Sequence, residues 1–103
     1  MKIKLNRDKM QSVHDLISHL LAAYPAEDKA ERLLHKLINR VRIKFRNRLD
    51  QVNERNGYQV TLTEDEALAL DIWFNQVVLP ADNWIYERLQ VEKMCNEADR
   101  LYG

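Results

Sequence analysis

Few residues in this chain can end a helix or form a tight turn. Its 103 residues include two glycines and two prolines, the residue types that most often interrupt regular structure. Pro25 lies in the segment YPAED and Pro80 in LPADN, and a helix cannot continue unbroken through a proline. Asn56-Gly57 suits a left-handed helix end. The chain therefore predicts long helices joined by few turns, and its length fits a single helical domain, residues 1–103.

Between these breaks one pattern occurs twice. Short segments at 2–5 and 58–62 alternate apolar and polar residues, which is typical of a half-buried strand. Each ends in an N-cap residue, Asn6 or Thr63, and Glu66 has the spacing of a capping box with Thr63. Two helices follow each strand, at 7–24 and 26–55 and then at 64–79 and 82–101. The predicted fold is mainly α, with four helices in two hairpins, and its two strands can pair as a ribbon.

The double pattern has two explanations. Residues 1–57 and 58–103 form a pseudo-repeat if one ancestral segment was duplicated, and an ERL triplet shortly after each proline favours this. The simpler explanation is that any helical hairpin with a strand in front of it produces the same signals. One window is also ambiguous, because residues 40–46 (RVRIKFR) alternate like a strand. The helical period continues from Leu34 to Val52 around this window, so we favour helix.

Charge is divided unevenly along the chain. The formal net charge is zero, yet residues 1–57 carry a surplus of +6 and residues 58–103 a deficit of −6. Most of the positive charge lies between Lys29 and Arg48, where Glu31 is the one acidic residue. Such a division indicates a polyanion site, an acidic partner, or two halves that attract each other. We also expect Arg48 or Arg55 to pair with an acid such as Asp71, Glu87 or Glu92.

Helix 26–55 collects this charge on its solvent side, because its apolar residues occupy one arc of the helical wheel. Ile43 projects into the basic face. The residues expected to contact a protein partner or a nucleic acid are Arg32, Lys36, Arg40, Ile43, Lys44, Arg46 and Asn47. The simpler alternative is a solvated helix face that the acidic second half partly balances. No helix-turn-helix, zinc-finger or RNP-like pattern accompanies the basic residues.

Helix 64–79 is apolar almost all round, which in a water-soluble protein indicates central burial or an oligomer interface. Central burial is the simpler expectation. Three neighbouring helices cannot easily cover a fourth on every side, however, so a homodimer is the other. The residues expected at such an interface are Leu70, Trp73, Phe74, Val77 and Trp84.

Nothing in the sequence favours catalysis. Asp15 and His19 share a helix face, but no third or fourth metal ligand lies near them. Cys95 lies on an apolar stripe and suits a small buried side chain. We expect no enzyme activity, no metal, no cofactor and no small-molecule substrate.

The expected function is that of a small non-enzymatic protein–protein interaction module that can form a homodimer. The alternative is a nucleic-acid-binding accessory protein that uses the basic face of helix 26–55. MKIKLNRDKM lacks the apolar region that is typical of a secretory signal, no apolar run is long enough to span a membrane, and the one cysteine has no partner within the chain. We therefore expect a cytoplasmic protein without membrane contact.

Overall fold

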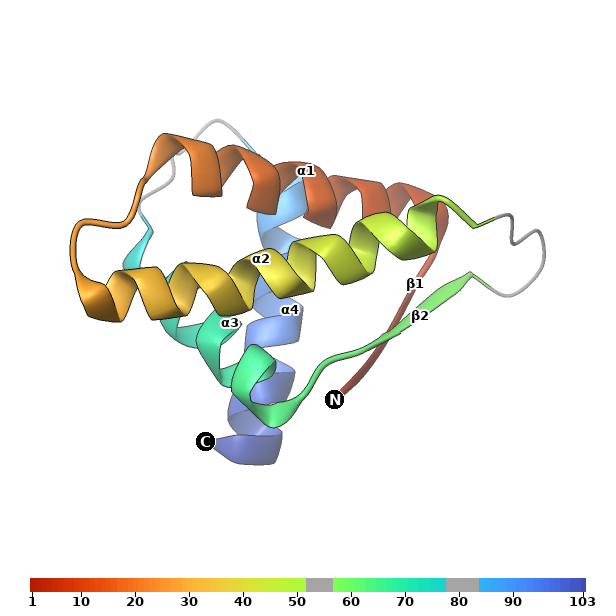
Figure 1. Cartoon of the computed structure of the whole chain (residues 1–103). Helices are drawn as coiled ribbons and strands as arrows, with labels where there is room; N and C mark the ends of the chain where they lie inside the picture. The colour runs from red at the N-terminus through yellow and green to blue at the C-terminus, as the bar shows by residue number, and fades with distance from the viewer. Residues whose placement is uncertain (52–56, 78–83) are drawn as a thin grey trace.

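A computed structural model describes residues 1–51, 57–77 and 84–103. Over these residues the fold is mainly α, as predicted, with four helices and two short strands (Figure 1). The elements are β1 (Lys2–Leu5), α1 (Arg7–Ala23), α2 (Lys29–Leu49), β2 (Tyr58–Thr61), α3 (Glu64–Gln76) and α4 (Ile85–Tyr102). The predicted order of one strand and two helices, twice over, is confirmed. The internal duplication stays a prediction.

The two strands pair, as the sequence allowed, and the pairing is antiparallel. Ile3 lies opposite Val60, and Leu5 lies opposite Tyr58. Met1 and Leu62 continue the ladder, since the Leu62 amide donates to the Met1 carbonyl at 2.8 Å. A two-stranded ribbon is marginal by itself, and this one buries Ile3, Tyr58 and Val60. The ribbon therefore packs on the helices and joins the chain's start to its middle.

Each helix lies against two others. α1 contacts α2 and α4, while α3 contacts α2 and α4, so both predicted hairpins are present (Figure 1). The largest side chains with almost no exposure come from all four helices, from β2 and from the residue directly after it: Phe45, Met10, Leu16, Ile17, Leu20, Ile38, Leu62, Leu70, Val13, Val41, Val60 and Val91. One continuous core therefore holds both halves of the chain together.

The strand interpretation of residues 40–46 is wrong, because α2 continues through them. Its buried residues Ile38, Val41, Phe45 and Leu49 recur every three or four positions, the period of one helix face.

The predicted bounds of α2 need correction at both ends. The helix begins at Lys29, not residue 26, because the Asp28 side chain accepts the Glu31 amide at 2.8 Å. It ends at Leu49, not at residue 55. There Arg7 donates to the Leu49 carbonyl at 3.1 Å and to the Tyr58 hydroxyl at 2.8 Å. The predicted cap residue Asn56 lies outside the described residues, while Gly57 has the expected positive φ of 69°.

The other helix ends differ less. α1 ends at Ala23, one residue early, and α4 extends to Tyr102, one residue late. α3 ends at Gln76 rather than 79, because Val77 is already extended with φ −88° and ψ 129°. Trp84 is left-handed with φ 62°, so α4 begins at Ile85 rather than 82. The N-caps Asn6 and Thr63 and the Thr63–Glu66 capping box are confirmed.

Candidate functional site

A groove of about 350 Å³ lies between α2 and α3, and we call it the α2–α3 groove. The two helices run in opposite directions along it. Lys44 pairs with Glu66 at one end, and His35 meets Trp73 at the other. Most of the lining is apolar: Ala30, Glu31, Leu33, Leu34, Leu37, Asp65, Leu68, Ala69, Ile72 and Gln76.

Leu33 and Ile72 distinguish this groove from the rest of the described surface. Leu33 is 63% exposed and Ile72 is 53% exposed, which makes them the two most exposed large apolar side chains among the described residues. They stand on opposite walls, one on α2 and one on α3. Single exposed apolar residues are ordinary, but apolar side chains gathered around a groove mark an interaction surface.

The solvent faces of α2 and α3 beside the groove differ in charge, although the charged residues that line the groove itself, Glu31 on α2 and Asp65 on α3, are both acidic. Lys36 and Arg40 follow Leu33 on α2 at helical spacing, so they lie beside it on the solvent side. Glu64 and Asp65 occupy the first turn of α3, and Asp65 lines the groove itself. Lys36, Arg40, Glu64 and Asp65 are all exposed. None of them has an ion-pair partner among the described residues.

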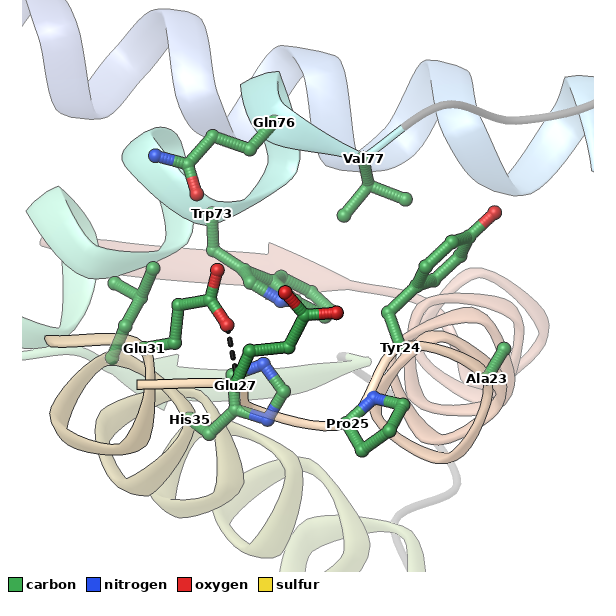
Figure 2. Close-up of a pocket in the computed structure, with 10 residues that line it drawn as sticks. Ala23, Tyr24, Pro25, Glu27, Glu31, His35, Trp73, Gln76 and Val77 are labelled. Carbon is green, nitrogen blue, oxygen red and sulfur yellow. Dashed lines mark hydrogen bonds between the residues drawn. The ribbon is translucent and has the colours of Figure 1, made fainter. Parts of the chain in front are cut away.

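A second pocket of about 300 Å³ adjoins the groove and shares Glu31, Leu34 and Gln76 with it. Figure 2 shows Glu27, Glu31 and Trp73 among the residues that line this pocket. The Glu31 carboxylate accepts the Glu27 amide at 2.6 Å, and His35 meets Trp73 edge-on with ring centres 6.3 Å apart. The first contact is local to the start of α2, and the second joins α2 to α3.

The predicted basic surface is present, with one exception. Arg32, Lys36, Arg40, Arg46 and Asn47 are exposed. Ile43 lies among them and is 40% exposed.

Lys44 is the exception. Its ammonium donates to the Thr61 carbonyl at 2.9 Å and pairs with Glu66, whose side chain is 3% exposed. Burial raises the pKa of Glu66, but the hydrogen bond from Lys44 and then that from the Thr63 amide lower it by more, so the net shift is downward. Lys44 therefore anchors α2 to α3 and is not available to a phosphate.

The residues predicted for a dimer interface lie largely inside the chain's own core. Leu70, Trp73 and Phe74 are buried, so a partner cannot reach them in this fold. Val77 is half-buried at the rim of the second pocket. Trp84 is half-buried and stacks on His19 with ring centres 5.1 Å apart. α2 and α4 cover α3 on two sides and leave Ile72 exposed. The homodimer itself stays a prediction.

Arg48 has no acidic partner among the described residues, and the expectation that Arg48 or Arg55 pairs with an acid stays a prediction. The Arg48 guanidinium donates to the Gln51 side chain at 3.2 Å, while Arg55 lies outside the described residues. Within the described part of the chain, Lys44–Glu66 is the one ion pair that joins residues 1–57 to residues 58–103. The exposed charges of Lys36, Arg40, Glu64 and Asp65 therefore have no ion-pair partner among the described residues.

The described residues hold no group of three His, Cys, Asp or Glu side chains placed to bind a metal. Asp15 accepts from Gln11 at 2.8 Å, and His19 lies against Trp84. Cys95 is buried, as predicted, and its thiol donates weakly to the Leu70 carbonyl at 3.9 Å. Burial, with Asp71 and Glu92 nearby, raises the pKa of Cys95 to about 12. A thiol with such a pKa remains protonated near neutral pH and is a poor nucleophile.

None of the helices in the described segments combines the length and apolar character needed to cross a bilayer. Comparisons with protein families, with curated proteins and with solved structures found no match to this chain.

Proposed function

We propose that this chain is a small cytoplasmic, non-enzymatic protein–protein interaction module that binds its partner through the α2–α3 groove. The observation that carries this proposal is the pair Leu33 and Ile72, strongly exposed on opposite walls of one apolar groove. Burying a leucine or isoleucine side chain contributes about 1.5–3 kcal/mol. A partner that covers both residues gains this free energy without any rearrangement of the core.

Site-specific photo-crosslinking tests this function. A photoreactive amino acid at position 72, in the cells that make the protein, should crosslink to one protein species of defined mass. Leu33→Glu in the same chain should reduce that product at least about tenfold, because a carboxylate in the apolar contact costs more than the roughly 1.4 kcal/mol that a tenfold change represents. The matched control is the photoreactive group at Leu89, which is 47% exposed and lies on α4 outside the groove.

A product of the same mass at position 89, or no product at position 72, would contradict the proposed function. A product that contains a different protein supports the interaction function and identifies its partner. A product of twice the chain's mass supports the function as well and points to self-association.

A second candidate function is nucleic-acid binding by the basic face of α2. It is favoured by Arg32, Lys36, Arg40 and Arg46, which are exposed and have no ion-pair partner among the described residues. Such a row can follow phosphates at helical spacing.

If this function is correct, DNA or RNA of mixed sequence should bind in a fluorescence anisotropy assay. The affinity should fall at least about tenfold between roughly 50 mM and 200 mM salt. Lys36→Ala with Arg40→Ala should weaken binding strongly, and Lys93→Ala on α4 serves as the control. Lack of binding at low salt would exclude this function.

A further inference from the structure

We propose that the occupant of the α2–α3 groove is a second copy of this chain. The two copies form a two-fold symmetric dimer in which α2 of each lies against α3 of the other. This inference rests on the proposed function, since it names the partner of the same groove.

The apolar part of the groove is able to complement itself. In a two-fold dimer the same surface patch meets its own copy. A two-fold axis that runs along the groove places the α2 wall of one copy over the α3 wall of the other. Leu33 of one copy then covers the wall that carries Ile72 in the second copy, and the reverse contact forms as well. Both strongly exposed apolar side chains become buried in one step.

The charges select this orientation. Beside the groove α2 exposes Lys36 and Arg40, whereas α3 exposes Glu64 and Asp65; within the groove α2 also contributes Glu31. When α2 faces α3 of the other copy, the dimer has two symmetry-related contacts, and in each of them a basic helix face meets an acidic one. An axis across the groove would instead place α2 on α2 and bring like charges together, which costs free energy. Of the two orientations, charge complementarity favours the first.

The dimer also accounts for the division of charge along the sequence. Residues 1–57 carry +6 and residues 58–103 carry −6, but Lys44–Glu66 is the one ion pair between them in the described part of the chain. The basic helix belongs to the first half and the acidic helix to the second. In the proposed dimer, the exposed positive charge on α2 of one molecule lies opposite the exposed negative charge on α3 of the other.

The contact must extend beyond the groove. A stable interface covers about 800 Å² on each partner. The apolar side chains of one groove are too few to supply this area, so the charged side chains of both walls have to take part. Exposed ion pairs are screened by salt, and dimerisation should therefore weaken as the salt concentration rises.

Sedimentation equilibrium of the purified full-length chain tests the dimer. The wild type should shift from monomer to dimer between about 1 µM and 500 µM, the range expected for an interface at the small end. Leu33→Glu should remain a monomer throughout that range. Leu89→Glu, the same substitution at an exposed leucine outside the groove, should dimerise like the wild type. Circular dichroism should show that both variants keep the wild-type helical content.

Charge reversal tests the orientation. Lys36→Glu with Arg40→Glu makes both walls acidic, and Glu64→Lys with Asp65→Lys makes both walls basic. Each double variant alone should be monomeric at concentrations where the wild type is a dimer. An equimolar mixture should form a heterodimer, because every wall then meets a wall of opposite charge. Reversal in the first turn of α3 removes a favourable helix-dipole interaction, so circular dichroism also checks that this variant is folded.

A wild-type chain that is monomeric at every concentration would overturn the dimer. So would a Leu33→Glu variant that dimerises normally, or charge variants that self-associate as well as the wild type. The proposed function is judged separately, because photo-crosslinking from position 72 to a different protein would support it even when the dimer is overturned.

Discussion

Replacing Trp73 with alanine is expected to destabilise the fold by about 3–5 kcal/mol, the usual cost of deleting a large buried aromatic side chain. Trp73 is 3% exposed. It meets His35 edge-on at 6.3 Å, so it helps to hold α3 against α2 at the end of the groove. The measurement is the free energy of unfolding by urea, taken at a concentration where the chain is monomeric. The urea midpoint should fall, with little change in slope.

Leu33→Ala is the matched comparison, because Leu33 lies on the same groove but is 63% exposed. Its effect on the unfolding free energy of the monomer should be within about 0.5 kcal/mol. Comparing the two variants shows whether Trp73 belongs to the core of the monomer or to an interface between two copies. If Trp73→Ala left the monomer's stability unchanged and altered only self-association, Trp73 would belong to the interface that the sequence suggested, and the described burial would be wrong.

Replacing Lys44 with methionine is expected to destabilise the fold by about 1–3 kcal/mol. The substitution leaves the buried Glu66 carboxylate without its cation, and breaking a fully buried pair costs about 3–5 kcal/mol. Lys44 is 37% exposed, so solvent compensates part of the loss and the smaller range applies. Methionine keeps most of the apolar stem that packs along α2. Urea unfolding near neutral pH measures the effect.

Glu66→Gln provides the control, because its amide oxygen can still accept the Thr63 amide of the capping box. In that background Lys44→Met should cost less, since no buried charge is left unpaired. An equal cost in both backgrounds would show that the ion pair contributes nothing measurable.

The free energy of unfolding should depend on pH through the Lys44–Glu66 ion pair. In the folded state the pKa of Glu66 is below its ordinary value of 4.5. Its contribution to stability is therefore present above about pH 4.5 and is lost as the pH falls through the lower folded pKa. The Glu66→Gln variant has no carboxylate at this position to protonate. Its free energy of unfolding should therefore fall less than that of the wild type as the pH is lowered below about 4.5.

The local features of the fold could be predicted from the sequence because short-range chemistry determines them. The alternation at 2–5 and 58–61 and the caps Asn6 and Thr63 involve residues within a few positions of one another. Helical periodicity likewise resolved residues 40–46, where a seven-residue window gave the opposite answer. Each of these signals is complete within one segment of the chain.

The end of α2 could not be predicted, because residues distant in sequence determine it. Arg7 reaches both the Leu49 carbonyl and the Tyr58 hydroxyl, and Tyr58 donates to the Gln51 carbonyl at 3.0 Å. These three contacts exist only once β2 and α1 are in place. A helical wheel for residues 26–55 carries no information about them.

The α2–α3 groove could not be predicted from the sequence for a related reason. The wheel separates an apolar arc from a charged arc, but it does not show how far a neighbouring helix covers either one. Leu33 lies off the apolar arc, as Ile43 does, and the same argument applied to Leu33 would have pointed to the groove. Ile72 was hidden among the many apolar residues of α3. Only the packing of α3 against α2 and α4 shows which side of that helix remains exposed.

Cysteine crosslinking between two variants tests the proposed dimer most directly. Leu33→Cys and Ile72→Cys are mixed and treated with a short bifunctional thiol reagent, and the native Cys95 stays unreactive because it is buried with a pKa of about 12. The two-fold arrangement of α2 on α3 predicts that the mixture forms a crosslinked dimer joining position 33 to position 72, in clear excess over the product of either variant alone. No crosslinked product, or a dominant product joining position 33 to position 33, would contradict it.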